Sequence, residues 1–428
     1  CTDLRYSSER NWVIQLKYYL GIDIGSVSTN VIAIGEDYEV YFNQYIRANG
    51  QPLESVKKGM NLLKENLQLK DEDILGIGTT GSGRELAGVL VGADVIKNEI
   101  TAHATATLHY HPEASTIFEI GGQDSKIIIL QDGMVTDFAM NTVCAAGTGS
   151  FLDHQAERLG IPIEDFGDMA LSAKQDVRIA GRCTVFAESD MIAKQQYGFS
   201  KAEIIKGLCT ALVRNYINNL GRGKKLEPPF IFQGGVAANK GIRAAFENEV
   251  GHEVIIPKYF NVMGAIGCAI LAKEYIEEEK VKPAFKGFDR LSLEFTPTSF
   301  ECNDCPNMCE VVKVVSEGET LAVWGDKCGK YAGLRSKEVG ENMEHFTYRT
   351  KGTCSRQINF EIDGKTVHNV EFISGCAGNT QGVAKLVEGM DVEKVIALLQ
   401  NIDCNGRGTS CPAQLAEALM QAKAQVNN

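Results

Sequence analysis

The chain has 428 residues, 13 of them cysteine, and 43 Lys and Arg against 55 Asp and Glu give it a formal net charge of −12. A composition of 44% apolar and 23% charged residues is typical of a folded protein, and the acidic balance argues against general nucleic-acid binding, which needs clustered Lys and Arg. We find no apolar run approaching the roughly 18–20 residues of a membrane helix, and no secretory-signal pattern. We therefore expect a cytoplasmic protein of about three domains whose thiols serve metals or redox chemistry.

Residues 1–17 do not begin with Met and show no periodicity, so we set them aside as an extension that need not be native. From residue 18 onward, β-rich runs end in glycine-containing turns and are followed by apolar residues at helical spacing. We expect strands within 18–25, 31–47, 74–81, 115–130, 134–141 and 252–257, helices over 53–68, about 147–160, 184–196, 200–221 and 261–279, and a strand, Gly turn and helix within 229–250.

This order of elements occurs twice, with Gly-rich turns at matching places. It predicts a duplicated α/β domain with a ligand in the cleft between its halves. The first half covers 18–114 together with the helix at 261–279, and the second half covers 115–260.

The remainder of the chain has a different texture. A charged, Pro-containing linker (280–290) leads to a Cys-rich, hairpin-forming module (291–340). Residues 346–428 then predict a small α+β domain. Its strands are expected at 354–362 and 367–373, joined by a turn at Asp363-Gly364, and its helices near 380–388, 391–400 and 411–424.

Three Gly-rich turns carry the first chemical signal. They are DIGSVSTN (23–30), GGQDSK (121–126) and QGGVAANKG (233–241), and each follows a β run. Small residues let backbone N–H groups approach a phosphate, and Asp23 can hold a hydrated Mg²⁺. The third turn leads into a helix whose N-terminus can receive a nucleotide.

The order of these turns resembles the two phosphate loops and the adenosine loop of the actin/Hsp70/sugar-kinase ATPase superfamily. More narrowly, NTVCAAGTGSFLDHQAERLG (141–160) and GRCTVFAESDMI (181–192) resemble the BadF/BadG/BcrA/BcrD family, the activators of 2-hydroxyacyl-CoA dehydratases, over residues 18–278. The resemblance implies Asp23, Gln123 and Asp124 as catalytic residues that organise Mg²⁺ and the attacking water. It implies an ATP site formed by Gly25, Ser26, Ser28, Thr29, Gly121, Gly122, Lys126, Gly234, Gly235 and Asn239.

Cys144 and Cys183 each stand just before a helical pattern, where the helix dipole and free N–H groups favour a thiolate. Two cysteines cannot complete the four thiolates of an iron–sulfur cluster, but a two-fold dimer supplies two more. The family resemblance implies one [4Fe-4S] cluster bridging a homodimer. It also implies an anaerobic setting, ferredoxin or flavodoxin as electron donor, and a 2-hydroxyacyl-CoA dehydratase or related iron–sulfur enzyme as acceptor.

The tail carries two more groups of cysteines. Cys302, Cys305, Cys309 and Cys328 have a spacing that fits Zn²⁺ or a second iron–sulfur site, and the metal stays open. The last unit resembles the TSCPD domain, with Ala413 in place of the motif's final Asp. Its cysteines are Cys354, Cys376, Cys404 and Cys411. Three roles stay open: the four bind a metal together, Cys404 and Cys411 form a redox pair, or all four are structural.

Other candidates have simpler interpretations. Cys209 and Cys268 fall on apolar helix faces and are expected in the core. His103, His109 and His111 are interpreted as a surface helix end rather than a metal site. Three alternative functions remain: a small-molecule kinase of the same superfamily, a protein related to B12-dependent ribonucleotide reductase through its last domain, and a non-enzymatic metal-binding adaptor.

Overall fold

The computed structural model describes residues 4–6, 12–14, 16–141, 147–181, 183–303, 305–316, 319–328, 331, 343–363, 366–404 and 406–426. The chain divides into two compact units, residues 1–295 and 296–428. Within the described residues, no helix combines the length and the apolar character needed to cross a membrane. At the start of the chain, β1 (Leu4–Tyr6) pairs antiparallel with β2 (Trp12–Ile14).

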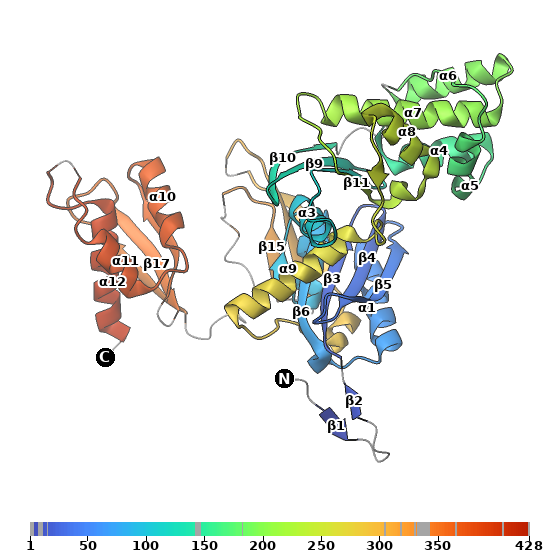
Figure 1. The fold of residues 1–428 in the computed structure, drawn as a ribbon. Helices are drawn as coiled ribbons and strands as arrows, with labels where there is room; N and C mark the ends of the chain where they lie inside the picture. Colours follow the sequence, from blue (N-terminus) through green and yellow to red (C-terminus); the bar gives the residue numbers. More distant parts are fainter. Residues whose placement is uncertain are drawn as a thin grey trace. The chain divides into compact units, whose positions relative to one another are not determined.

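The first half of the larger unit is a five-stranded sheet with the order β5–β4–β3–β6–β7 (Figure 1). Strands β3, β4 and β5 form an antiparallel meander, and β6 and β7 continue the sheet in parallel with β3. The strands are β3 (Tyr18–Ile24), β4 (Ser28–Ile34), β5 (Val40–Arg47), β6 (Ile74–Gly81) and β7 (Val95–Ile96). Its accompanying helices are α1 (Pro52–Leu67), η1 (Asp71–Asp73) and α2 (Arg84–Val91).

The second half repeats this topology, with the order β10–β9–β8–β11–β12. Again three antiparallel strands are followed by two parallel ones. The strands are β8 (Thr116–Ile120), β9 (Ser125–Gln131), β10 (Met134–Asn141), β11 (Phe230–Gln233) and β12 (Val254–Ile255). The predicted duplicated α/β fold is therefore confirmed, although β12 is shorter than the strand expected at 252–257.

Helices α3 (Glu99–Tyr110) and α9 (Met263–Glu279) pack against each other, and α3 contacts strands of both sheets (Figure 1). α9 lies against β3 and β6, and small residues permit the close approach. A Cβ on Gly21 would come within 1.8 Å of the Ala265 carbonyl oxygen, and one on Gly267 within 1.8 Å of the Ala102 oxygen. These close contacts fix α9 against β3 and α3 within the first half, and α3 in turn contacts β9 and β10 of the second sheet.

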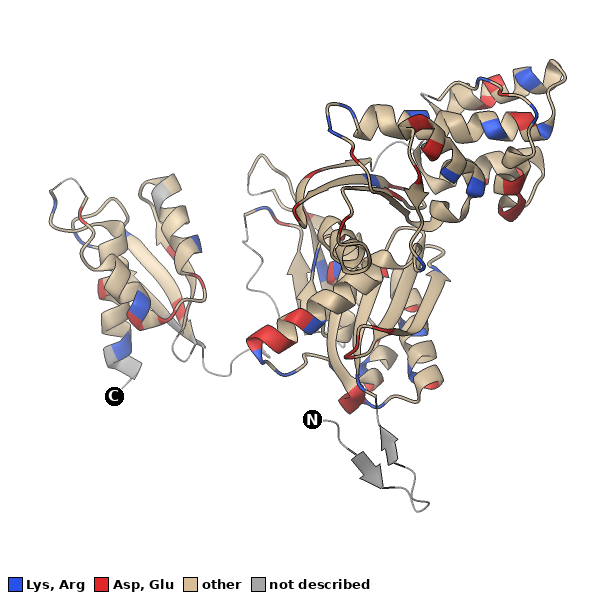
Figure 2. Ribbon diagram, in the orientation of Figure 1, with Lys and Arg blue, Asp and Glu red and all other residues tan. Residues whose placement is uncertain are grey.

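The helices of the second half cover the face of its sheet opposite α3. Phe118, Ile120 and Ile127 pack there against the helices, whereas Ile117 and Ile128 point towards α3, as alternation along a strand requires. These helices are α4 (Gly149–Leu159), α5 (Ile163–Leu171), α6 (Thr184–Gln196), α7 (Lys201–Leu220) and α8 (Lys240–Val250), with η3 (Gly235–Ala238) before α8. Figure 2 shows acidic and basic residues interspersed along them.

The second unit contains two small sheets. After η4 (Phe288–Ser292) of the first unit come three antiparallel strands: β13 (Thr296–Glu301), β14 (Glu310–Ser316) and β15 (Glu319–Trp324). The other sheet is antiparallel too and consists of β16 (Met343–Arg349), β17 (Gln357–Asp363) and β18 (Thr366–Ile373). Its buried face packs on α10 (Ala377–Val387), α11 (Val392–Leu399) and α12 (Cys411–Val426).

Candidate nucleotide-binding cleft

Asp23 stands near the end of β3 and faces the beginning of α9. It is half-buried and lines a cavity between the two halves. A Cβ on Gly264 of α9 would come within 2.4 Å of the Asp23 Oδ2 atom, so this position leaves no room for a larger residue. Desolvation first, and then the negative charge of Glu99, raise the pKa of Asp23 to about 7. Asp23 is therefore poised to ionise when a cation arrives.

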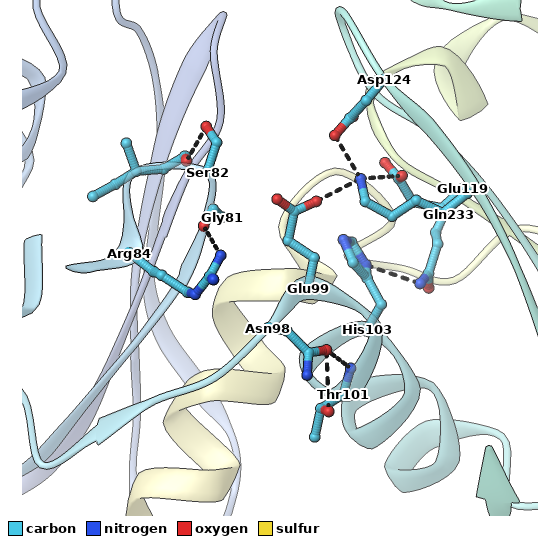
Figure 3. A network of polar contacts seen from close by, with 12 residues as sticks. Gly81, Ser82, Arg84, Asn98, Glu99, Thr101, His103, Glu119, Asp124 and Gln233 are labelled. Atoms are coloured by element: carbon cyan, nitrogen blue, oxygen red, sulfur yellow. Dashed lines mark hydrogen bonds and ion pairs between the residues drawn. The ribbon is translucent and has the colours of Figure 1, made fainter. Parts of the chain in front are cut away.

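Lys126 pairs with three carboxylates, those of Glu99, Glu119 and Asp124, which Figure 3 shows directed towards one ammonium group. Its side chain is 2% exposed, and its Nζ atom lies 2.6 Å from Glu99 Oε2, 3.0 Å from Glu119 Oε2 and 3.0 Å from Asp124 Oδ2. Glu119 and Lys126 are cross-strand partners on β8 and β9, and both therefore point to the α3 side of the sheet. Glu99, in the first turn of α3, completes the network from the neighbouring element.

This network has more negative than positive groups. Burial raises the pKa of Glu119 to about 8, the nearby Asp124 and Glu99 acting in the same direction, and the three carboxylates raise the pKa of Lys126. One ammonium cannot offset four carboxylates, counting Asp23, in a sheltered site. The cleft therefore favours an additional cation. Within the described residues no three His, Cys, Asp or Glu side chains form a metal-binding group, so a cation there would need oxygen ligands from water or phosphate.

His103 lies beside this network, one turn after Glu99 (Figure 3). Thr107 donates to Gln233 Oε1 at 3.0 Å, which leaves the Gln233 amide nitrogen to donate to His103 Nδ1 at 3.0 Å. Burial and the charge of Lys126 lower the pKa of His103 to about 3, so its ring is neutral with the proton on Nε2. The expected surface position of His103 is wrong: its side chain is 6% exposed because α3 is enclosed by both sheets.

The three Gly-rich turns meet at one cavity. Each is tightened by a backbone hydrogen bond: Gly25 to the Ser28 oxygen (2.9 Å), Gly121 to the Asp124 oxygen (3.1 Å) and Gly234 to the Phe260 oxygen (2.8 Å). The predicted residues that line this cavity are Asp23, Gly25, Ser26, Ser28, Gly121, Gly122, Gln123, Asp124, Lys126, Gly234 and Gly235.

A wider cavity of about 320 Å³ continues from these turns between α4, α5 and α8. Asn239 lines it and caps α8, accepting a hydrogen bond from the Ile242 N–H at 3.1 Å. Ile163, Gly167 and Val236 supply apolar and small surface suited to a flat ring. Thr29 is the one predicted nucleotide-site residue that lies outside both cavities: its fully buried hydroxyl is 2.6 Å from Ser55 Oγ, because β4 turns this side chain towards α1.

The turn at 121–122 is bonded directly to the start of α4. Gly149 and Ser150 donate their N–H groups to the Gly121 and Gly122 oxygens at 2.9 and 2.8 Å, and Ser150 Oγ donates to the Gly122 oxygen at 2.6 Å. A Cβ on Gly149 would approach the Gly121 oxygen at 3.0 Å, so glycine permits this contact. α4 follows the segment that carries Cys144, and the cleft is thereby connected to that segment.

The two cysteine-bearing segments approach one side chain. Cys144 lies outside the described residues, but Gly147 and Gly181 are described and both border Asn215 of α7. The Asn215 amide donates to the Gly181 oxygen, and its Oδ1 atom would be 3.5 Å from a Cβ on Gly147. Cys183 is the half-buried N-cap residue of α6 and is a free thiol.

Helices α4 and α6 are joined at the surface as well. Arg158 of α4 lies 2.6 Å from Glu188 of α6. Beside Cys183, the apolar side chains of Val185 and Phe186 are each 64% exposed. This surface combines a helix N-terminus, a cysteine and uncovered apolar groups, which is a composition suited to a subunit contact.

The tail cysteines are placed as follows. Cys302 and Cys309 are buried beside Val311 and Val323, Cys305 is half-buried and Cys328 is exposed. In the last domain Cys411 is buried, and Cys354, Cys376 and Cys404 are exposed. Among the residues that the structure describes, neither group has a metal-binding arrangement. Cys209 and Cys268 are buried, which confirms their prediction as core residues, and burial raises the pKa of Cys209 to about 12.

Comparison with known proteins decides the family. Residues 20–272 match the BadF/BadG/BcrA/BcrD ATPase family, which is more than half of the chain. The chain belongs to this family. Residues 336–423 match the TSCPD domain, so this family member carries a TSCPD domain at its C-terminal end.

Relatives of this BadF/BadG/BcrA/BcrD protein include dehydratase activators. The (R)-2-hydroxyglutaryl-CoA dehydratase activating ATPase of Acidaminococcus fermentans is 34% identical over 60% of this chain and 96% of its own length. The activator of lactoyl-CoA dehydratase from Anaerotignum propionicum is 33% identical over 61% of this chain and all of its own length. The solved Clostridium difficile activator of 2-hydroxyisocaproyl-CoA dehydratase, with bound ADPNP, has a TM-score of 0.57 at 31% identity and covers 62% of this chain and 98% of its own. The fold is therefore that of the actin/Hsp70/sugar-kinase ATPases, as predicted.

Sequence motifs did not single out Glu99, His103, Glu119 or Gln233 for the cleft. A signal was present for Glu99: Asn98 before it caps α3 by accepting a hydrogen bond from the Thr101 N–H at 2.9 Å, which places Glu99 in a helical first turn. Glu119 lies two residues before the GGQD turn and two residues after Ile117, so alternation along β8 puts both side chains on the face towards α3.

Proposed function

We propose that this chain is an ATP-dependent activator of a 2-hydroxyacyl-CoA dehydratase or a related iron–sulfur enzyme. It would hydrolyse ATP in the cleft between its halves and act in the cytoplasm as a homodimer, with ferredoxin or flavodoxin as electron donor. The observation that carries the proposal is the direct bonding of the GGQD turn to α4, because it links a nucleotide-type cleft to a cysteine-bearing segment.

ATP would bind with its phosphates at the three turns and its adenosine in the wider cavity. Backbone N–H groups of the 25–28 and 121–124 turns are available at the cavity that Asp23 and Gln123 share. Gly234 and Asn239 would frame the adenosine at the beginning of α8. The solved Clostridium difficile activator contains bound ADPNP, which supports nucleotide binding by this chain.

Mg²⁺ fits the excess of carboxylates at the cleft. Asp124 is the most accessible carboxylate of the network, with 31% of its side chain exposed even when paired with Lys126, against 13% for Glu99 and 5% for Glu119. Mg²⁺ usually keeps several waters and takes only one or two carboxylates together with phosphate oxygens, so it needs no cage of three protein ligands. Asp23 and Asp124 would take this role, and Glu99, Glu119 and Lys126 would position Asp124 rather than bind the ion.

A dimer-bridging [4Fe-4S] cluster is proposed at Cys144 and Cys183. In support, Cys183 is the N-cap residue of the 13-residue helix α6, and Asn215 is hydrogen-bonded to Gly181 and lies next to Gly147. When bound, such a cluster supplies one-electron chemistry at low potential. The exposed Val185 and Phe186 would be covered by the second subunit.

Coupling would pass from the phosphates to the cysteine segment through α4. A shift of the Gly121-Gly122 turn on phosphate binding must move Gly149 and Ser150, because three hydrogen bonds join them. The Arg158–Glu188 ion pair would then transmit the movement of α4 to α6. Cys183 is the N-cap residue of α6, so it would move with this helix. Nucleotide state would in this way set the exposure of the cysteine surface.

The tail is proposed to consist of a metal-binding module (291–340), with Cys302, Cys305, Cys309 and Cys328 as ligands, and the TSCPD domain. The linker is proposed at 280–290 and the ATPase halves at 18–114 and 115–260. Residues 1–17 are proposed to lie outside these domains.

The test is ATP hydrolysis by anaerobic, full-length protein without any sugar or acid acceptor. We expect phosphate release from the wild type, loss of at least about tenfold in Asp23→Asn, and no loss in Asp176→Asn, a surface carboxylate on another face. Hydrolysis that requires a small-molecule acceptor would instead establish a kinase, and no hydrolysis would exclude the activator function.

A further inference from the structure

A group of thiols lies within the TSCPD domain. Cys354 and Ser355 precede β17, and Cys411 begins α12. Ser355 Oγ donates to the Cys411 sulfur at 3.3 Å, and the backbone N–H groups of Cys354 and Ser355 are hydrogen-bonded to it too. Because these donors come from Cys354 and its neighbour, the two cysteines are adjacent in space.

The Cys411 sulfur is sheltered but well supplied with donors. The side chain is 9% exposed, and this burial alone would raise the pKa of its thiol. The hydrogen bonds from Ser355, Cys354 and Thr353 outweigh the burial, and the pKa of Cys411 is lowered overall. A thiolate is thus stabilised at the beginning of α12.

Arg407 brings the other thiols to the same place. Its Nη1 atom donates to the Cys354 sulfur at 3.4 Å, and the pKa of the guanidinium is raised by that bond and by the nearby Cys354, Cys404 and Cys376. Cys354 and Arg407 are both exposed, so a molecule from solvent can reach this sulfur.

The position of Arg407 distinguishes two kinds of thiol site. A permanent positive charge among the thiols repels a divalent cation and stabilises a sulfur anion. The arrangement therefore favours thiol exchange over metal binding.

We propose that Cys354 and Cys411 form a dithiol that exchanges with an accessible disulfide, with Cys354 as the attacking thiol and Cys411 as the resolving thiol. Cys354 attacks one sulfur of the disulfide, the S–S bond breaks, and the first thiol leaves and takes a proton. Cys411 then attacks the Cys354 sulfur of the mixed disulfide, and the second thiol leaves with a proton. The two protein thiols are oxidised to one disulfide while the substrate disulfide is reduced to two thiols.

The test uses reduced, full-length protein with oxidised glutathione as the probe disulfide, followed by alkylation and peptide mass spectrometry. The wild type should form a Cys354–Cys411 disulfide and release two glutathiones. Cys411→Ala should accumulate glutathione at Cys354. In Cys354→Ala, the reaction at this domain should be slower by a factor of about ten or more. Arg407→Gln, a surface change, should slow the reaction without unfolding the domain, whereas Cys376→Ala is the matched control and should react as the wild type does.

Two results would overturn the proposal. One is an equal rate of reduction of oxidised glutathione by the wild type, Cys354→Ala and Arg407→Gln. The other is one Zn²⁺ bound per chain that is lost on substitution of Cys354, Cys376, Cys404 or Cys411 individually. The first outcome is read from peptides of residues 343–426 and the second from zinc analysis of the intact single variants, so neither depends on whether Cys144 and Cys183 hold a cluster.

Discussion

Replacing Lys126 by Met tests the carboxylate network directly. The substitution keeps the length of the side chain but removes three ion pairs of 2.6, 3.0 and 3.0 Å from a residue that is 2% exposed. Removal of one partner from a buried ion pair costs about 3–5 kcal/mol of unfolding free energy. For a domain of this size, that corresponds to a melting temperature lower by roughly 10 °C.

The loss should depend on pH in a definite direction. The pKa of Glu119 is raised to about 8 in the folded protein and stands at 4.5 in its ordinary state. Between these values the folded state holds a proton that the unfolded state has released, so this group lowers the unfolding free energy as pH rises through the window. Without the ammonium the pKa of Glu119 rises further, and Lys126→Met should lose more stability at pH 8 than at pH 6.

Differential scanning calorimetry of the two proteins at pH 6 and pH 8 provides the measurement. Lys273→Met is the matched control, because Lys273 is also buried but has one carboxylate partner among the described residues, the half-exposed Glu277 at 2.9 Å, and otherwise lies over the Tyr38 ring at 4.2 Å. It should cost less, about 1–2 kcal/mol, and show no comparable pH dependence. If Lys126→Met melts like the wild type at pH 8, or if the control loses as much, the electrostatic interpretation of the cleft is refuted.

Three further predictions concern nucleotide binding and coupling. Mg²⁺ affinity in the presence of ADPNP should rise about tenfold from pH 6 to pH 8 as Asp23, with a pKa of about 7, ionises, and calorimetric titration that shows no pH dependence would count against this role. Gly264→Ala places a methyl 2.4 Å from Asp23 Oδ2 and should reduce hydrolysis at least about tenfold, whereas Gly382→Ala, with no atom within 4 Å, should not. Ser150→Ala removes the hydrogen bond from the Ser150 hydroxyl to the Gly122 oxygen. It should leave nucleotide affinity within about twofold but weaken the nucleotide-dependent hydrogen-exchange protection of α4. Unchanged protection would exclude coupling between the Gly121-Gly122 turn and α4.

Local patterns were sufficient for much of the fold. Alternation and Gly-containing ends gave the strands of both sheets except the two-residue β7, and the 3.6-residue spacing gave α1, α7 and α9 within two residues of their observed ends. The three Gly turns were recognisable because a close backbone approach needs small residues in consecutive positions. These features depend on neighbours in sequence, so a single chain is enough to infer them.

The rest of the cleft depends on contacts between distant segments. His103 has no signal of its own, because its neutral state arises from burial by both sheets and from the charge of Lys126. The position of its proton depends on Gln233, 130 residues later. Lys126 was predicted to contact nucleotide, yet its ammonium is occupied by Glu99, Glu119 and Asp124, two of which come from other elements. Thr29 was carried into the site by its motif, although strand alternation turns it away.

The central claim is that Cys144 and Cys183 hold a cluster shared by two subunits, and iron content measures this most directly. Anaerobically purified dimer should contain about four iron atoms from this site, with the visible absorption of an iron–sulfur centre. Cys183→Ser should lose these atoms and the absorption, whereas Cys209→Ala, a change at a buried core cysteine, should retain both. Iron content that is the same in the wild type and in Cys183→Ser would contradict a cluster held by Cys183.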